Sequence, residues 1–140
     1  MTSFKTTLRV NWVDTDAAEV VHFSNYFRFF ERAEEEFYRH LGLTFQDIRE
    51  HHKIWLPRIE AFCKYKAPAR FNDLLTIELV IEEIREKSIK YGFYIRKNET
   101  SQLLAEGYVV IVAADKDAGA AVKIPAEITE KLKAFTQTQT

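Results

Sequence analysis

The sequence of 140 residues lacks most of the features that mark specialised classes of protein. Its single cysteine, Cys63, allows no internal disulfide, which excludes a small disulfide-stapled scaffold. No apolar run approaches the ~18 residues of a membrane span, and the first residues lack the apolar segment of a secretory signal. A formal net charge of -1 gives no general attraction to nucleic acid or to anionic membranes. We therefore predict a cytoplasmic protein with no membrane span and no nucleic-acid partner.

Proline and glycine are also scarce, at three and four residues, so each one carries information about the chain around it. Gly42 follows a helical pattern and is expected to end it in the left-handed conformation. Pro57 cannot donate to a strand ladder, so it must lie at the start or the edge of a strand. What the chain has in quantity is apolar surface, because 46% of its residues are hydrophobic and 14% are aromatic. This composition predicts one globular domain over residues 1–140 and excludes a disordered chain.

Hydrophobic periodicity predicts the order of the elements. Half-buried strands are indicated where apolar and polar residues alternate, in residues 4–12, 55–65, 75–82 and 89–95. Residues 103–114 are apolar on both faces and are expected to lie centrally in the sheet. A long helix follows the first strand, and a short helix capped by Thr44 comes next. One long helix and consecutive strands joined by short turns predict an α+β fold with a mostly antiparallel sheet.

The long helix presents one wide apolar face. Its residues recur at three- and four-residue steps: Tyr26, Phe29, Phe30, Ala33, Phe37 and Leu41. Ser24 or Asn25 is expected to cap the helix with its side chain. So aromatic a helix needs a broad cover, which a sheet provides. The second face of the sheet still carries tyrosines and aliphatic residues, which favours a homo-oligomer whose subunits complete the cover.

The loop before this helix carries two carboxylates, Asp14 and Asp16, close to the backbone N–H groups of a helix start. A base beside such N–H groups is a plausible catalytic arrangement, because the N–H groups stabilise an anion. Each carboxylate also has a structural interpretation. Asp14 can bond loop amides, and Asp16 can cap a turn or a short helix at Ala17.

Several motifs together resemble those of the hotdog-fold acyl-CoA thioesterases, over residues 4–128. The nearest resemblance is to the 4-hydroxybenzoyl-CoA thioesterase-like superfamily and its branch associated with the Tol–Pal system. The motifs are DTD at 14–16, VVHF at 20–23, FERA at 30–33 and YKAPAR at 65–70. The resemblance implies a hotdog fold, in which a long antiparallel sheet wraps around one central helix. It also implies dimers or tetramers with active sites at subunit interfaces.

The resemblance further implies a role for particular residues. Asp16 is the implied catalytic carboxylate, as nucleophile or as general base, and the backbone N–H of Phe23 is the implied donor to the thioester oxygen. Contacts with the acyl-CoA substrate are implied for His22, Tyr26 and Glu31, and contacts with CoA phosphates for Arg85 and Lys87. Neither a cofactor nor a metal is required, and the spacing of His51 and His52 with His22 and Asp16 fits no regular ligand motif.

Three positions depart from the family pattern, and one of them is Phe23, which stands where some branches have His or Tyr. Glu19 stands where the family usually has glycine, at a place where glycine would permit a positive φ. His22 replaces the common tyrosine or tryptophan. The leading interpretation is an acyl-CoA thioester hydrolase, and the alternative is a non-catalytic acyl-thioester-binding or scaffold protein on the same fold. Structural interpretations also exist for Glu31 as a solvated helix charge, for Arg85 and Lys87 as turn charges, and for Cys63 as a core residue.

Overall fold

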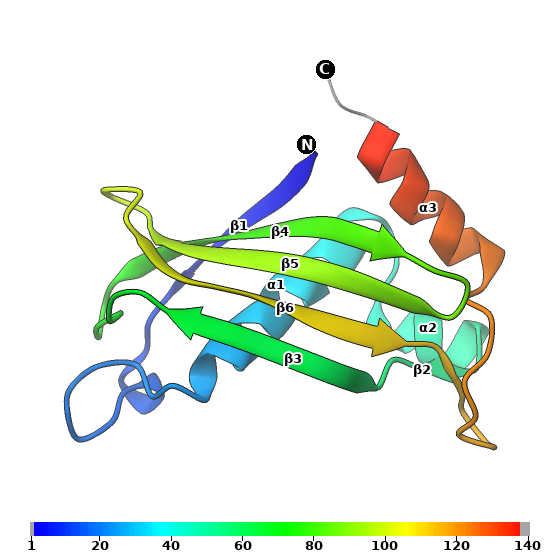
Figure 1. Ribbon diagram of the computed structural model, residues 1–140, viewed down its shortest axis with the longest axis horizontal. Coiled ribbons are helices and arrows are strands. Elements are labelled where there is room, and N and C mark those ends of the chain that lie inside the picture. Colours follow the sequence, from blue (N-terminus) through cyan, green and yellow to red (C-terminus); the bar gives the residue numbers. More distant parts are fainter. Residues whose placement is uncertain (1, 138–140) are drawn as a thin grey trace.

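A computed structural model describes residues 2–137 of the chain, which form one sheet, a long helix against it and two further helices (Figure 1). The strands of the main sheet are β1 (Ser3–Arg9), β3 (Arg58–Tyr65), β4 (Leu74–Ile84), β5 (Ser88–Lys97) and β6 (Leu103–Val112). The helices are α1 (Asn25–His40), α2 (Phe45–His51) and α3 (Ala126–Gln137). Two short strands, β2 (Ile54–Trp55) and β7 (Ala114–Asp115), pair with each other, and a 3-10 turn covers Trp12–Asp14.

All pairings in the main sheet are antiparallel, in the order β1-β4-β5-β6-β3. The predicted α+β class and antiparallel sheet are therefore confirmed. β6 lies between β5 and β3, as its two apolar faces predict. β3 and β4 are consecutive in the chain but are not neighbours in the sheet. The segment around Pro68 therefore crosses from one side of the sheet to the other, and the prediction that short turns join all consecutive strands was wrong at this place.

Helix α1 lies across one face of the sheet, and its aromatic stripe forms the core (Figure 1). Tyr26, Phe29, Phe30, Ala33 and Phe37 are all at most 3% exposed. The ring of Phe30 stacks on that of Phe93 in β5, with centroids 4.6 Å apart and planes at 8°. Contacts of this kind hold the helix against the strands, because a stacked aromatic pair stabilises the packing by more than the burial of its apolar surface alone. The predicted apolar face is thus the buried face.

The ends of the helices follow the predictions in part. Gly42 ends α1 with φ at 77°, the left-handed conformation expected of it. Thr44 caps α2, because its side chain accepts a hydrogen bond from the Asp47 N–H at 3.0 Å. Ser24 stands at the N-cap of α1 but makes no side-chain cap bond, and the Asn25 side chain instead donates to the Asp14 carbonyl. The side-chain cap predicted for α1 is therefore absent.

Two strand predictions needed correction. Residues 4–12 were expected to alternate through Trp12, but β1 ends at Arg9, where its pairing with β4 stops, and Trp12 is 80% exposed. The strand expected over residues 55–65 is interrupted near Pro57, so that β2 pairs with β7 while β3 pairs with β6. β3 is exposed along almost its whole length, including Ile59, Phe62 and Tyr65. No helix among the described residues is long and apolar enough to cross a membrane.

Candidate active site

The acidic loop is held in one shape by backbone hydrogen bonds. Asp16 donates its N–H to the Val20 carbonyl and accepts from the Glu19 N–H at its own carbonyl, both at 2.9 Å. One carboxylate oxygen of Asp16 accepts from the Ala18 N–H at 2.8 Å. Glu19 adopts φ of 67°, the conformation for which glycine was expected at this position. The loop therefore keeps the positive φ, and its glutamate bears the steric cost.

Asp14 bonds a loop amide, as its structural interpretation expected. Its carboxylate accepts from the Asn11 N–H at 2.8 Å, and its carbonyl accepts from the His22 N–H and the Asn25 side chain, both at 2.9 Å. These bonds connect the 3-10 turn to the start of α1. Asp14 thus braces the loop, while Asp16 keeps one carboxylate oxygen free of partners among the described residues.

The start of α1 supplies an available hydrogen-bond donor. The backbone N–H of Phe23 donates to no acceptor among residues 2–137, and its ring is 64% exposed. The Phe23 carbonyl accepts from the Tyr65 hydroxyl at 2.9 Å, which ties the helix start to the end of β3. An unpaired N–H at a helix N-terminus carries a partial positive charge, so it suits a negatively charged oxygen.

Asp16, Phe23 and Tyr26 line one open cleft, which we call the acidic-loop cleft, of about 400 Å³. The rest of its lining consists of Val20, Val21, Tyr65, Lys66, Ala67 and Pro68. Tyr26 and Tyr65 meet edge to face with centroids 4.9 Å apart, and the Tyr26 hydroxyl accepts from the Ala69 N–H at 3.3 Å. The structure therefore brings together the predicted carboxylate, the predicted donor and one predicted substrate contact.

His22 lies beside this cleft. Its Nδ1 accepts from the Ser24 N–H at 3.2 Å and lies 2.8 Å from the Ser24 hydroxyl. An Nδ1 that accepts from a backbone N–H leaves Nε2 to carry the ring proton. The imidazole stacks on the Phe23 ring with centroids 4.7 Å apart. His22 thereby orients the exposed Phe23 ring.

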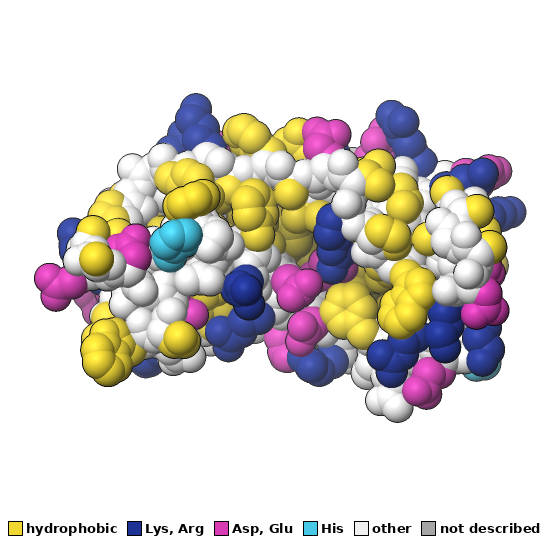
Figure 2. All heavy atoms as spheres, turned by 90° about the horizontal axis from the view of Figure 1, so that it is seen from below, with side chains coloured by type: hydrophobic (Ala, Val, Ile, Leu, Met, Phe, Trp, Pro, Cys, Tyr) yellow, Lys and Arg dark blue, Asp and Glu magenta, His cyan; other side chains and the backbone are white. Residues whose placement is uncertain are grey.

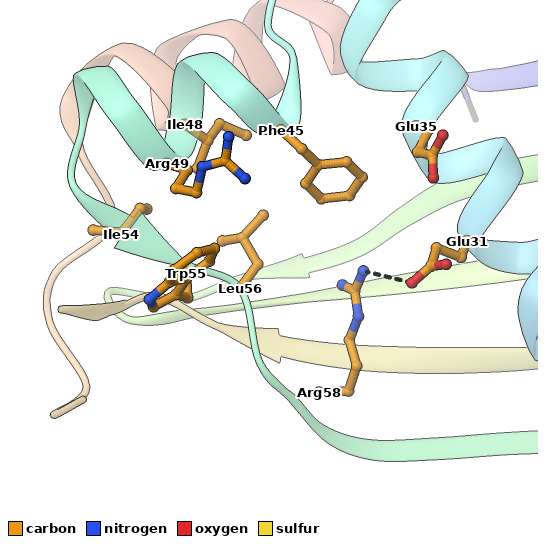
Figure 3. Close-up of a pocket in the computed structure, with 9 residues that line it drawn as sticks. All are labelled: Glu31, Glu35, Phe45, Ile48, Arg49, Ile54, Trp55, Leu56 and Arg58. Carbon is orange, nitrogen blue, oxygen red and sulfur yellow. Dashed lines mark ion pairs between the residues drawn. The ribbon is translucent and has the colours of Figure 1, made fainter. Parts of the chain in front are cut away.

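Glu31 lies in a separate hollow, which we call the α2 pocket (Figure 3). This cavity of about 360 Å³ has one apolar wall and one charged wall. The apolar wall comes from α2, β2 and the residue that follows β2, and it consists of Phe45, Ile48, Ile54, Trp55 and Leu56. The charged wall holds Glu31 and Glu35 of α1 and Arg58 of β3, and Arg49 lies over the Trp55 ring, 5.9 Å from its centroid. Within one chain the structure does not bring Glu31 to Asp16.

A buried polar cluster lies behind the charged wall. Glu34 is 1% exposed, and one of its carboxylate oxygens accepts from the Tyr38 hydroxyl at 2.7 Å and from Arg58 Nη1 at 3.0 Å. The Tyr38 and Tyr91 hydroxyls lie 3.0 Å apart. Burial raises the pKa of the Glu34 carboxyl, while the Arg58 guanidinium and the Tyr38 hydroxyl oppose that rise. Burial likewise raises the pKa of both tyrosines.

Arg85 and Lys87 lie in the β4–β5 turn, and Figure 1 shows this turn at the opposite end of the sheet from the loop that precedes α1. This turn contacts the segment after β6, since the backbone carbonyl of Lys87 accepts a hydrogen bond from the Ala113 N–H at 2.9 Å. Arg85 pairs with Glu83 at 3.0 Å. The two cations are therefore at the α2-pocket end of the molecule, and the structure does not bring them to Asp16 of the same chain.

The family model described as the thioesterase-like superfamily matches residues 10–132. This protein belongs to the thioesterase-like superfamily. It resembles the acyl-CoA thioester hydrolase YbgC of Escherichia coli O6:H1, with 34% identity over 114 residues, or 81% of this chain and 84% of that protein.

Solved structures agree on the fold. A gentisyl-coenzyme A thioesterase is 30% identical with a TM-score of 0.81, covering 90% of this chain and 99% of that one. A 1,4-dihydroxy-2-naphthoyl-CoA thioesterase from Synechocystis is 24% identical with a TM-score of 0.88, covering 94% and 96% of the two chains. The predicted hotdog-fold thioesterase is confirmed by these likenesses.

Sequence reasoning missed three residues at the sites of this thioesterase. Tyr65 was quoted in a motif but given no role, although its hydroxyl holds the Phe23 carbonyl. Glu34 was given no role, yet it is buried, and Arg58, the partner 24 residues away that makes this burial possible, was given no role either. Only its position between the buried Ala33 and Phe37 could have signalled this.

One group of possible metal ligands is found among the described residues. The ligand atoms of His51, His52 and Glu127 lie within 4.8 Å of one another. His52 Nε2 and Glu127 are 2.7 Å apart, a hydrogen bond that ties the end of α2 to the start of α3. That tie accounts for the proximity of two of the three groups, and none of the three lines the acidic-loop cleft.

Proposed function

We propose that this protein hydrolyses acyl-CoA thioesters to free CoA and a carboxylic acid, with Asp16 as nucleophile or general base. The observation that carries this proposal is that Asp16 and the unpaired Phe23 N–H line the same cleft. The similarity to the acyl-CoA thioester hydrolase of E. coli supports the reaction. It also supports the assignment of this protein to the same branch of the superfamily, for which the sequence motifs suggested the branch associated with the Tol–Pal system. His22 and Tyr26 are proposed to contact the substrate beside the reacting group.

A thioester carbonyl is already electrophilic, so its hydrolysis needs only a well-placed carboxylate and a hydrogen-bond donor to the carbonyl oxygen. The carboxylate of Asp16 attacks the carbonyl carbon, or takes a proton from the water that attacks it. Negative charge then develops on the carbonyl oxygen, where the Phe23 N–H donates. One such donor contributes about 3 kcal/mol to transition-state stabilisation in comparable sites. Collapse of the intermediate expels the CoA thiolate. With Asp16 as general base this step releases the carboxylic acid directly, whereas with Asp16 as nucleophile it leaves a mixed anhydride, which water then hydrolyses to release the acid and regenerate the carboxylate.

The complete site requires a second subunit. Seven residue steps separate Arg58 and Tyr65 on β3, or roughly 23 Å at strand spacing. The outer edge of β3 pairs with no strand among residues 2–137, and it carries exposed apolar side chains. The face that includes this edge shows two groups of hydrophobic side chains with charged side chains between them (Figure 2). An unpaired edge of this kind is a template for another strand.

A two-fold axis through the middle of β3 would pair it with a second copy in antiparallel fashion. The start of each β3 would then lie near the end of its partner, so the α2 pocket would adjoin the partner's Asp16. We propose that the acyl group enters the α2 pocket beside Glu31, while the CoA phosphates lie near Arg85 and Lys87. This homodimer, alone or paired into a tetramer, accounts for predicted site residues that one chain keeps apart.

The test is thiol release from aromatic, short aliphatic and long aliphatic acyl-CoAs. Asp16→Asn preserves the shape of the side chain but removes its charge, so kcat should fall by about 100-fold or more. Asp14→Asn is the matched control, because its side-chain oxygen can still accept from the Asn11 N–H. Equal and near-background rates for wild type and Asp16→Asn across the panel, with CoA binding retained, would instead support a non-catalytic acyl-thioester-binding protein.

A further inference from the structure

The proposed reaction gives no role to Glu34, the most deeply buried charged residue among those described. Its side chain is 2% exposed, and it projects from the middle of α1 into the space between the helix and the sheet. Its carboxylate has two hydrogen-bond donors, Tyr38 and Arg58. Helix packing alone does not require this arrangement, because well-packed apolar residues commonly replace a buried ion pair with no loss of stability.

The partner of Glu34 connects the core to the α2 pocket. Arg58 Nη1 donates to Glu34 at 3.0 Å, while 30% of the Arg58 side chain is exposed. Arg58 lines the pocket, and its guanidinium lies between Glu31 and the apolar wall (Figure 3). Nη2 is 3.9 Å from Glu31, beyond hydrogen-bond distance. A guanidinium has five N–H donors, so most of those on Arg58 remain available at the pocket.

The tyrosines behind Glu34 limit where its carboxylate can go. Tyr38 is 1% exposed and Tyr91 is fully buried, and their hydroxyls bond to each other. The rings of Tyr38 and Phe45 meet edge to face at 5.2 Å, so the same tyrosine also supports the apolar wall. The Tyr38 hydroxyl thus fixes the Glu34 carboxylate on one side, and the carboxylate fixes the Arg58 guanidinium on the other.

We propose that Glu34 is a positioning residue, which fixes the Arg58 guanidinium as a hydrogen-bond donor to an oxygen atom carried by the acyl group. The charges around the pocket favour a neutral oxygen substituent such as a ring hydroxyl. Glu31 and Glu35 would repel a carboxylate there, whereas a hydroxyl can accept from Arg58 and donate to Glu31. This inference rests on the proposed function only in placing the acyl group in the α2 pocket.

Binding of two non-hydrolysable thioether analogues of aryl-CoA tests the proposal, one with a ring hydroxyl and one without. Calorimetry gives the ratio of their Kd values for each variant. Wild type should prefer the hydroxylated analogue, and Glu34→Gln should reduce that preference roughly tenfold, as expected when a hydrogen bond to a charged group is weakened. Glu36→Gln, the same change on the exposed side of α1, should leave the ratio unchanged.

A double-variant cycle shows whether Glu34 acts through Arg58. Arg58→Met should abolish the preference by itself, which also tests the proposal should Glu34→Gln fail to fold. Glu34→Gln should then change nothing further in the Arg58→Met background. The proposal is overturned if wild type shows no preference, or if Glu34→Gln lowers only the melting temperature. Absence of thiol release by wild type, with the binding preference intact, would refute the hydrolase and leave this inference standing.

Discussion

Replacement of Gly107 by alanine should force two strands of the sheet apart. Gly107 of β6 lies opposite Cys63 of β3, where an added Cβ would be 2.0 Å from the Phe62 carbonyl oxygen and 3.0 Å from Cys63 Cα. Both atoms belong to the backbone, so no rotamer change relieves the contact. Since real Cβ atoms stay at least 3.0 Å away, β3 must move by about 1 Å, the difference between 3.0 and 2.0 Å.

The expected loss in free energy of unfolding is about 3 kcal/mol, at the upper end for overpacked sites. For a chain of this length the melting temperature should fall by roughly 10 °C. Differential scanning calorimetry at one fixed protein concentration measures this. Thiol release should fall as well, since β3 carries Arg58 and Tyr65.

Gly92→Ala on the neighbouring strand is the matched control. Its Cβ would meet the Glu82 carboxylate oxygen at 2.3 Å and Val80 Cγ2 at 3.0 Å. The first contact is with the end of a flexible side chain, so the cost should stay below about 1 kcal/mol. Equal melting temperatures for the two variants would show that β3 moves away from an added Cβ at little cost in stability. That result would refute the reasoning from backbone contact.

Two further predictions concern titration. Burial raises the pKa of the Cys63 thiol to about 11, so alkylation by iodoacetamide should keep rising about tenfold per pH unit from pH 8 to 10; a plateau near pH 9 would contradict this. Burial also raises the pKa of Glu34 above its ordinary 4.5, so the folded state holds this proton to higher pH than the unfolded state. The stability of wild type relative to Glu34→Gln should therefore be greatest below pH 4.5 and decline as pH rises through the raised pKa, as measured by urea unfolding. A difference that does not vary with pH would contradict this.

The sequence predicted well those features that depend on residues close together in the chain. Gly42 and Thr44 act where they stand, because a left-handed cap and a side-chain cap are made within one turn of helix. The buried stripe of α1 and the strands from Leu75 to Val112 follow from periodicity. The acidic-loop cleft was predictable too, since the DTD motif and the start of α1 are only a few residues apart.

Features that depend on distant residues were missed. The alternation continues through Trp12, but β1 ends at Arg9, which pairs with Leu74, the first residue of β4. The alternation within residues 4–12 does not show where the partner strand begins. Glu34 has the local signature of a surface charge, and only Arg58 and Tyr38 make its burial tolerable. The separation of Glu31 from Asp16 was likewise hidden, because shared motifs do not say whether two residues meet within one chain or across two.

The distance between the acidic-loop cleft and the α2 pocket divides the protein into parts that can change independently. The loop is braced by its own backbone bonds and by Asp14, none of which involves α2 or β2. Residues 44–56 contain α2 with its own helix cap and β2, whose only strand partner among the described residues is the short β7. With the acyl group in the α2 pocket, as we propose, exchanging this segment between members of the superfamily would change the shape offered to that group without disturbing Asp16. A fold arranged in this way can acquire new substrates by local replacement, while the chemistry stays as it was.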